Sequence, residues 1–320
     1  MKKLANAAFL LAFLFILPQR VQAASLVPVG QVVGLEIGDD TVIVAAFDDA
    51  LGGQARAAGL QVGDDIQYID GKTMDSPEDV RGALERSDGS VELTVERGGK
   101  QVQLKLEPAI TKEGPRLGVY LRRGITGIGT VTFYDPETGN FGTLGHGVND
   151  SGGKLLTFQE GTAYRASILS VKKGLSGEPG QLRGAIESGD VIGALSANTA
   201  RGVFGHAEAG WEGEAIPTAR FREIRTGAAT ILSTVSGTEV REYSVEILKI
   251  YPASRSDGRN LLIKVTDPAL LETTGGIVQG MSGIPLIQDG KLIGAVTHVL
   301  VNDPTTGYGI FIENMLDAAA

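Results

Sequence analysis

The sequence predicts a mainly β protein of two domains behind a short N-terminal targeting segment. A chain of 320 residues is long enough for two domains, and its 45 glycines suit short strands joined by tight turns. Apolar and polar residues alternate through many short segments, which is typical of strands with one buried face. Over residues 111–320 this pattern predicts either a β-sandwich or a pair of barrels.

The N-terminal segment, residues 1–24, has the layout of a signal peptide. Met1-Lys2-Lys3 is basic, Leu4 to Leu17 is apolar apart from Asn6, and Val21-Gln22-Ala23 offers small residues at cleavage spacing. The apolar run is shorter than the roughly 20 residues that a membrane-spanning helix needs. This layout predicts export across the cytoplasmic membrane.

Residues 25–110 form the first predicted domain. It contains a strand from Thr41 to Phe47, a helix that starts at Ser76-Pro77 with an N-cap and a first-turn proline, and a hairpin that turns at Gly98-Gly99. The run Gly59-Leu60-Gln61-Val62-Gly63-Asp64-Asp65-Ile66 resembles the PDZ domains of bacterial proteases.

A PDZ domain binds a peptide by adding it as an extra strand to a sheet edge. The resemblance places that groove beside Val33, Gly34, Leu35 and Ile37, where amides near Val33 and Gly34 would take a terminal carboxylate. A domain that only packs against the second domain and restrains it fits the same residues. Both roles stay open.

A serine in a glycine-rich turn is the strongest chemical signal of the chain. Gly280-Met281-Ser282-Gly283-Ile284-Pro285 lies between apolar runs, and the Asp289-Gly290 turn that follows predicts a hairpin. A nucleophilic serine needs an exposed Oγ and convergent N–H groups, and glycines let the backbone turn sharply. The pattern resembles the nucleophile loop of chymotrypsin-like serine peptidases, which implies an oxyanion hole at the N–H groups of Gly280 and Ser282. A plain turn between strands explains the hexapeptide alone equally well.

The chain has three histidines, and a serine nucleophile needs one of them as its base. His146 lies between glycines at the end of a predicted strand, which makes it the best candidate. His298 alternates with Val296 and Leu300 in a strand and shares their face, which favours a structural role. His206 has no evident partner.

Four segments together resemble the stage IV sporulation protein B peptidases, which are PDZ-containing serine peptidases of spore-forming bacteria. They are Gly145-His146-Gly147, Gly280 to Gly283, Gly294 to Val299 and Tyr308 to Phe311. The resemblance runs from about Val27 to the C-terminus and implies a PDZ domain followed by a two-barrel chymotrypsin-like peptidase domain. The chain order of histidine, acid and serine agrees with that fold, whereas α/β-hydrolases place the serine first. Ile284 departs from the family, which usually has serine there, and this bears on packing and cleavage preference more than on chemistry.

Two carboxylates are candidates for orienting His146. Asp150 sits in a turn rich in glycine and polar residues, so an exposed turn carboxylate explains it. Asp267 follows the apolar strand Leu261 to Thr266, and it matches the family's acid by its place fifteen residues before the serine. The predicted triad is therefore His146, Asp267 and Ser282.

The resemblance implies an exported serine endopeptidase that cleaves itself. It then cleaves a membrane-associated regulator of an intramembrane protease, which activates a late sigma factor in sporulation. The implied location is the space between the forespore and mother-cell membranes, and an uncleaved N-terminal segment would tether the protein there. An inactive PDZ protein that binds peptides at the membrane surface is the main alternative, and an esterase with the same triad is another.

Composition argues against several other classes. The net charge is −9 and no basic cluster appears, so nucleic acid is not expected as a partner. The lack of cysteine excludes disulfides, thiolate zinc sites and cysteine nucleophiles, and three scattered histidines argue against a metal site. We therefore expect no cofactor and no metal, and we expect protein substrates, a peptide ligand and the chain itself as partners.

Overall fold

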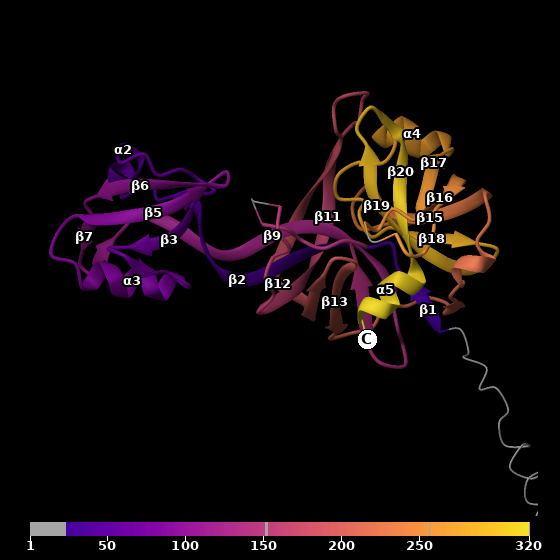
Figure 1. The fold of residues 1–320 in the computed structure, drawn as a ribbon, viewed down its shortest axis with the longest axis horizontal. Coiled ribbons are helices and arrows are strands. Elements are labelled where there is room, and N and C mark those ends of the chain that lie inside the picture. The colour runs from indigo at the N-terminus through magenta and orange to yellow at the C-terminus, as the bar shows by residue number, and fades with distance from the viewer. Residues whose placement is uncertain (1–23, 151–152, 256, 320) are drawn as a thin grey trace, which may run out of the picture.

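The computed structural model describes residues 24–150, 153–255 and 257–319, so the targeting segment lies outside the described residues up to position 23. Figure 1 shows two bodies connected by the long strands β2 (Val32–Phe47) and β9 (Val119–Tyr134). The smaller body is the predicted PDZ domain, and the larger body holds the two predicted barrels. Within the described ranges, no helix is long and apolar enough to cross a membrane.

The first barrel is a ring of six antiparallel strands. The inner half of β2 pairs with β9 on one edge and with β11 on the other, and β10 joins the far end of β9. The remaining strands of the ring are β11 (Glu160–Lys172), β12 (Gln181–Thr199), β13 (Gly202–Ala207) and β10 (Asn140–Thr143). Its interior is filled by apolar side chains, among them Val33, Leu35 and Phe141.

The second barrel is also a closed ring of six antiparallel strands. In ring order they are β15 (Gly227–Thr234), β16 (Val240–Ile250), β17 (Leu261–Val265), β20 (Asp303–Phe311), β19 (Lys291–Leu300) and β18 (Pro285–Gln288). Ile284 is only 1% exposed and belongs to the core of this barrel. An apolar side chain at this position therefore fits the packing beneath the serine turn. The two barrels confirm the predicted two-barrel form.

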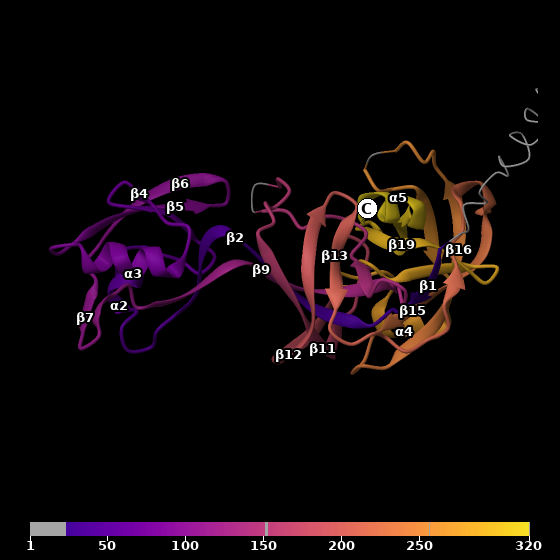
Figure 2. The same ribbon diagram turned by 90° about the horizontal axis from the view of Figure 1, so that it is seen from below.

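A smaller apolar cluster joins the barrels to each other. It includes Leu26 of β1, Phe133 of the first barrel, and Ala295 and Ile310 of the second. The C-terminal helix α5 (Ile312–Ala319) adds Met315 to it, and Figure 2 shows this helix against the barrels. The other short elements of the larger body are β1 (Ser25–Pro28), β14 (Ile216–Pro217), the 3₁₀ helix η1 (Phe221–Glu223) and α4 (Pro268–Thr274).

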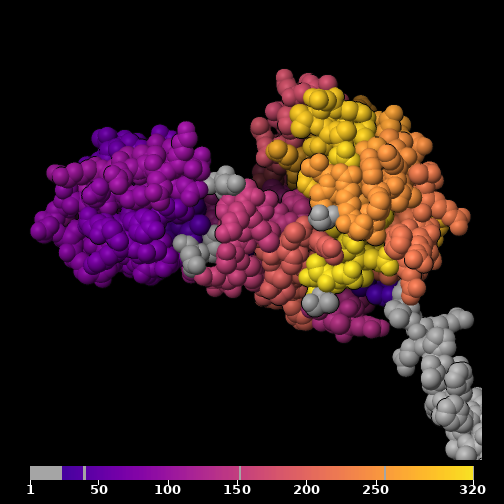
Figure 3. Space-filling model, in the orientation of Figure 1, coloured from indigo at the N-terminus to yellow at the C-terminus, as the bar shows by residue number. Residues whose placement is uncertain are grey.

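The PDZ domain has its own core and is drawn in Figure 3 as a separate body beside the barrels. Ser76 caps its second helix as predicted, because the serine Oγ accepts the amide of Asp79 at 3.1 Å. The domain uses the outer halves of β2 and β9. Its other elements are α2 (Gly53–Ala57), β3 (Asp65–Ile69), β4 (Lys72–Thr73), α3 (Pro77–Glu85), β5 (Val91–Arg97), β6 (Lys100–Leu106), and a hairpin of β7 (Ala109–Thr111) and β8 (Gly114–Arg116).

The domain boundary differs from the prediction of 25–110 for the PDZ domain and 111–320 for the peptidase. Val33 pairs with Gly129 of β9 and with Arg165 of β11, so the chain as far as Ile37 belongs to the first barrel. The chain then leaves for the PDZ domain and returns along β9. The PDZ domain is therefore inserted into the first barrel and does not precede it.

Candidate active site

Ser282, His146 and Gly280 line one cavity of about 480 Å³ between the two barrels. The first barrel contributes β9 residues around Gly127 and the segment that follows β10, which carries His146. The second barrel contributes the serine turn and His298 of β19. The side chains of His146 and Ser282, which lie far apart in sequence, thus line the same cavity.

The serine turn needs glycine where it meets the first barrel. Gly280 and Gly283 have φ of +94° and +95°, a region that favours glycine. A Cβ on Gly283 would lie 2.1 Å from the carbonyl oxygen of Thr130 and 2.5 Å from the amide nitrogen of Leu144. The turn can therefore press directly onto the backbone of the first barrel only because no side chain intervenes.

Two threonines of β9 hold the serine turn in place. The hydroxyl of Thr130 donates to the carbonyl of Gly280 at 3.2 Å, and its amide donates to the carbonyl of Ser282 at 3.0 Å. The hydroxyl of the fully buried Thr132 donates to the carbonyl of Gly283 at 2.7 Å. Because the carbonyls of Gly280, Ser282 and Gly283 accept hydrogen bonds from β9, the peptide units of this turn have fixed orientations.

The amides of Gly280 and Ser282 remain available to a ligand. Neither donates to a protein acceptor in the described parts of the chain, whereas the amide of Met281 between them donates to Val278 at 3.1 Å. Two convergent, unused N–H groups beside a serine are what an oxyanion hole requires. That these two amides form an oxyanion hole stays a prediction, and the lack of a protein acceptor among the described residues is compatible with it.

His146 is held in a tautomer that suits a base. Its Nδ1 lies 2.8 Å from the carbonyl oxygen of Gly147. A carbonyl can only accept a hydrogen bond, so Nδ1 carries the proton and Nε2 keeps its lone pair. Burial lowers the pKa of His146, and the bond to Gly147 offsets part of that effect. The ring is therefore neutral at pH 7.

Asn198 fixes the segment that follows His146. Its amide nitrogen donates to the carbonyls of Val148 and Leu156 at 2.9 and 3.0 Å, and its oxygen accepts the amide of Val148 at 2.9 Å. The side chain of Asn198 is 9% exposed, so these bonds lie away from water. The end of β12 thus holds in place the segment that follows the histidine.

The hydroxyl of Ser282 does not point to a base in this structure. It donates to the carbonyl oxygen of Thr297 in β19 at 3.0 Å. A rotation about χ1 is needed before the Oγ proton can be passed to a base.

The structure does not bring Asp267 to His146. Its Oδ1 accepts the amides of Ala269 and Leu270 at 2.9 and 3.1 Å, so Asp267 is the N-cap of α4. Gly258, before β17, lies beside the carbonyl of Gly145, while Asp267 follows the other end of that strand. A strand of this length separates the two ends by about 16 Å. In this structure Asp267 caps α4 and does not orient His146, contrary to the prediction.

Asp150 lies in the turn that the sequence predicts. Its Oδ1 accepts the amide of Lys154 at 2.9 Å. Within the described residues, the His146 ring is hydrogen-bonded to the carbonyl of Gly147 and not to a carboxylate. The backbone carbonyl of Gly147 thus occupies the position that an acid takes in a Ser-His-Asp triad.

Comparison with known proteins identifies the class to which this site belongs. A model of the SpoIVB peptidase S55 family matches residues 113–316. The chain belongs to this family. It is a serine peptidase.

Individual proteins and solved structures match parts of this SpoIVB-type peptidase. A curated Agrobacterium fabrum protein, named a zinc metalloprotease, is 36% identical over 88 residues, which cover 27% of this chain and about a fifth of that protein (22%). The active form of the Rv3671c protease from M. tuberculosis is 16% identical, with 60% of this chain and 72% of that chain covered and a TM-score of 0.35. The PDZ domain of the SdrC-like protein from Listeria monocytogenes is 28% identical, with 26% and 87% covered and a TM-score of 0.22.

Sequence reasoning missed His298 in this SpoIVB-type peptidase. Its ring centroid lies 5.4 Å from that of His146, and its Nδ1 is buried without a hydrogen-bond partner among the described residues. Burial is the main cause that lowers the pKa of His298 to about 4; the nearby His146 and Arg259 act in the same direction and Asp257 acts against them. His298 also lines a second, smaller cavity of about 200 Å³ next to Ser282 that does not include His146. The sequence pattern does not reveal the position of His298, because β19 has a bulge between Val296 and His298. The bulge breaks the alternation of side chains between the two faces of the strand.

The predicted peptide groove at Val33, Gly34, Leu35 and Ile37 is corrected by the structure. These residues pair with β9 on one edge and with β11 on the other, so no edge is left for a peptide. Val33, Leu35 and Ile37 are at most 4% exposed. The segment is a wall of the first barrel, and Leu35 and Ile37 line the cavity of Ser282.

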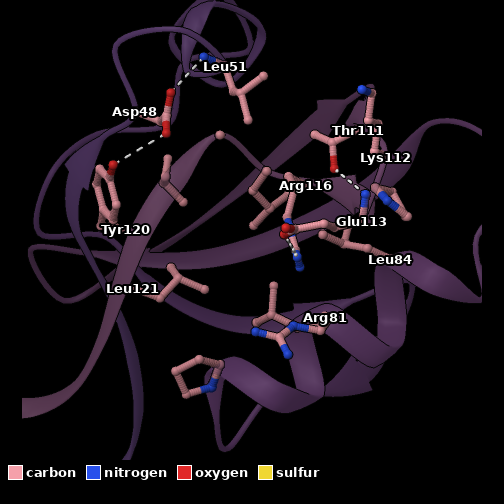
Figure 4. A pocket seen from close by; sticks show the side chains of 16 residues that line it. Asp48, Leu51, Arg81, Leu84, Thr111, Lys112, Glu113, Arg116, Tyr120 and Leu121 are labelled. Atoms are coloured by element: carbon pink, nitrogen blue, oxygen red, sulfur yellow. Dashed lines mark hydrogen bonds and ion pairs between the residues drawn. The ribbon is translucent and has the colours of Figure 1, made fainter.

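The cavity of the PDZ domain lies elsewhere, between α3, the β7–β8 hairpin and the start of β9. It has a volume of about 650 Å³, and Figure 4 shows Leu51, Leu84 and Leu121 on its walls. Gly118, with φ +73°, forms its turn into β9, and a Cβ there would lie 2.3 Å from the carbonyl oxygen of Leu51. The amides of Leu117 and Gly118 donate to no protein acceptor among the described residues.

No group of three or more histidine, aspartate or glutamate side chains in the described ranges could hold a metal ion.

Proposed function

We propose that this SpoIVB-type serine peptidase is an active endopeptidase in which Ser282 is the nucleophile and His146 the base. The observation that carries the proposal is the shared cavity between the barrels. It contains Ser282, a neutral histidine in the correct tautomer, and the unused amides of Gly280 and Ser282.

The reaction follows from this placement. The Ser282 hydroxyl turns from Thr297 toward Nε2 of His146, which accepts its proton as Oγ attacks the peptide carbonyl. The negative oxygen that forms is held by the amides of Gly280 and Ser282. His146 then donates the proton to the leaving amine, and water attacks the acyl-enzyme with His146 again as base. Throughout, Nδ1–H stays on the carbonyl of Gly147.

The cellular role extends this chemistry. We assign the protein to export, guided by residues 1–24, and to sporulation signalling, guided by its family. In this role it cleaves itself and a membrane-associated regulator of an intramembrane protease between the forespore and mother-cell membranes. The PDZ domain supports peptide or protein substrates over small esters.

A catalytically inactive PDZ protein is the second candidate. Two observations favour it: the hydroxyl of Ser282 is bonded to Thr297, and no carboxylate of the described residues is bonded to His146. The unused amides oppose it, because a protein without turnover has no need to keep two donors without acceptors beside a serine.

A serine-directed fluorophosphonate separates the two. The purified protein should become labelled on Ser282, as mapped by mass spectrometry, and should shorten itself with time. Ser282→Ala should lose both, while Ser170→Ala, an exposed serine of β11, should keep both. A wild-type protein that is folded, unlabelled and stable in length would support the inactive binding protein.

Export has a separate test. In intact spheroplasts, added protease should digest the barrels of the protein. A protected barrel domain would place it in the cytoplasm and contradict the assigned location.

A further inference from the structure

One edge of β9 is unpaired from the PDZ domain to the serine turn. Along its whole length β9 is bonded to β2 or β1 on one edge, from Phe47↔Val119 to Val27↔Tyr134. On the other edge, β10 is its strand partner and begins at Val131. Between Val119 and Gly129 that second edge has no partner strand among the described residues.

This edge connects the two cavities. At its start, Val119, Tyr120 and Leu121 line the PDZ cavity, and further along, Ile125, Gly127 and Ile128 line the cavity of Ser282. The edge ends where the amide of Thr130 donates to the carbonyl of Ser282. Every residue from Val119 to Ile128 apart from Gly124 is at least partly exposed, so a second chain can reach this side of β9.

We infer that β9 binds the C-terminal tail of the substrate as an added strand and sets the distance from the carboxylate to the cut. The bound partner is an extended polypeptide with a free, apolar C-terminus. This inference rests on the proposed peptidase function and specifies which substrates that function selects.

The PDZ end suits a terminal carboxylate. The unused amides of Leu117 and Gly118 lie immediately before β9, where backbone N–H groups can bind an anion. Arg81 and Lys112 line the same cavity (Figure 4), and neither has a carboxylate partner among the described residues. The surrounding leucines suit an apolar last side chain.

The direction of the tail follows from this end. A chain whose carboxylate sits before the start of β9 must run antiparallel to it, so its upstream residues lie progressively nearer Ser282. The chemistry of the cut demands the same direction. The leaving amine belongs to the C-terminal part of the substrate and receives its proton from His146, which lines the β9 cavity. The acyl part then occupies the smaller cavity beside Ser282, which His146 does not line.

The length of β9 predicts how many residues separate the C-terminus of the substrate from the cleaved bond. From Val119 to Thr130, β9 advances about 3.3 Å per residue, which an added strand matches with roughly 8 to 12 residues. Gly124 has φ +64°, and a Cβ there would lie 1.7 Å from the carbonyl oxygen of Ile37, so the strand bends at this glycine. The bend widens the expected range of tail lengths. At this point the buried Gly124 already uses its carbonyl to accept a hydrogen bond from the Arg122 guanidinium, so an added strand would form its backbone hydrogen bonds on either side of Gly124.

Proteome-derived peptides test the spacing without a known cleavage sequence. Limited chymotrypsin digestion supplies long peptides with apolar C-termini, and half of the sample is amidated at its carboxylates. After incubation with the full-length protein, mass spectrometry maps every cut. Cuts should gather roughly 8 to 12 residues from the free C-terminus, at least about tenfold above other distances, because tethering raises the local concentration of the bond. Amidation should remove that enrichment.

Two variants of α3 give a matched comparison. Arg81→Glu repels the carboxylate and should lose the enrichment. Arg86→Glu makes the same charge change at the C-cap of α3, outside the cavity, and should keep it. Separately, Ser282→Ala should bind a fluorescein-labelled decapeptide with a free carboxylate more tightly than its amide. Scattered cuts that ignore the C-terminus would overturn the inference and leave the peptidase intact. Tail binding without any cut by the wild type would instead contradict the peptidase function.

Discussion

His146 takes its tautomer from the backbone carbonyl of Gly147 and not from a carboxylate. A carbonyl fixes the ring and the proton position, as an acid does, but carries no charge to stabilise the imidazolium in the transition state. The lowered pKa of His146 also makes it a weaker base than an exposed histidine. At the residue scale we therefore expect a slow peptidase.

His298 should make the protein sensitive to mild acid. Its folded pKa of about 4 lies below its ordinary value of 6.5, so the unfolded chain takes up a proton first as the pH falls. The free energy of unfolding should therefore decrease from pH 6.5 toward pH 4. Thermal melting across this range should show a smaller decrease for His298→Gln, with His206→Gln as a control at an exposed histidine. If the melting temperature fell equally with pH in the wild type and in His298→Gln, His298 would not be the source of the acid sensitivity.

The serine turn is an element whose geometry depends on another barrel. Thr132 contributes a hydroxyl that no sequence motif marks, because a threonine in a strand is ordinarily explained by strand preference. Its bond to Gly283 crosses from the first barrel to the second. The turn was predictable from its glycines, but the groups that orient it were not, since they come from a strand about 150 residues earlier.

Thr132→Val should damage the turn more than its small change in shape suggests. The buried carbonyl of Gly283 would lose its partner, at a cost of about 1 to 3 kcal/mol. Thr132→Ser keeps the hydroxyl and is the matched control. Denaturant melts measure the stability, and the turnover of a casein substrate reports the oxyanion hole. If valine and serine variants behave alike, the hydroxyl does not hold the turn.

Helix α4 gives a decisive comparison for Asp267. Asparagine caps helices about as well as aspartate, so Asp267→Asn should keep stability and most of the turnover, while Asp267→Ala should lose about 1 kcal/mol. Thermal melting and turnover at neutral pH measure both. If Asp267→Asn instead kept its fold and lost turnover by about 10⁴-fold, Asp267 would be the orienting acid, because the same change has that effect in a Ser-His-Asp triad.

At the scale of the whole molecule, the sequence predicts the fold class better than the connectivity. Glycine turns and alternating strands indicate the two barrels, and the PDZ motif at Gly59 to Ile66 indicates the smaller domain. The path of the chain could not be predicted, because Val33 and Gly129 are paired across the entire PDZ domain. Alternation shows that a segment is a strand but not which distant strand completes it.

Two shortened chains test that connectivity. A chain that begins at residue 111 lacks β1 and β2, so its first barrel should not close and the protein should be insoluble. A chain in which residues 38–124 are replaced by an Asn-Gly hairpin turn keeps both strands and should fold, since Ile37 and Ile125 are paired neighbours. Circular dichroism and thermal melting distinguish them. A stable, folded 111–320 fragment would contradict the inserted arrangement.

The shared strands also have a consequence for how the chain folds. During synthesis, β2 emerges long before the inner half of β9. The first barrel cannot close until β2 pairs with a strand nearly a hundred residues later in the chain. Closing so long a loop is slow when the intervening chain is unfolded. Once the PDZ core has formed, Val44 is already paired with Leu121. Pairing of β2 with β9 can then extend residue by residue past Gly124 toward the barrel. We therefore expect the PDZ domain to nucleate folding of the peptidase. Weakening its core should slow the recovery of Ser282 labelling in refolding experiments without altering the finished barrel.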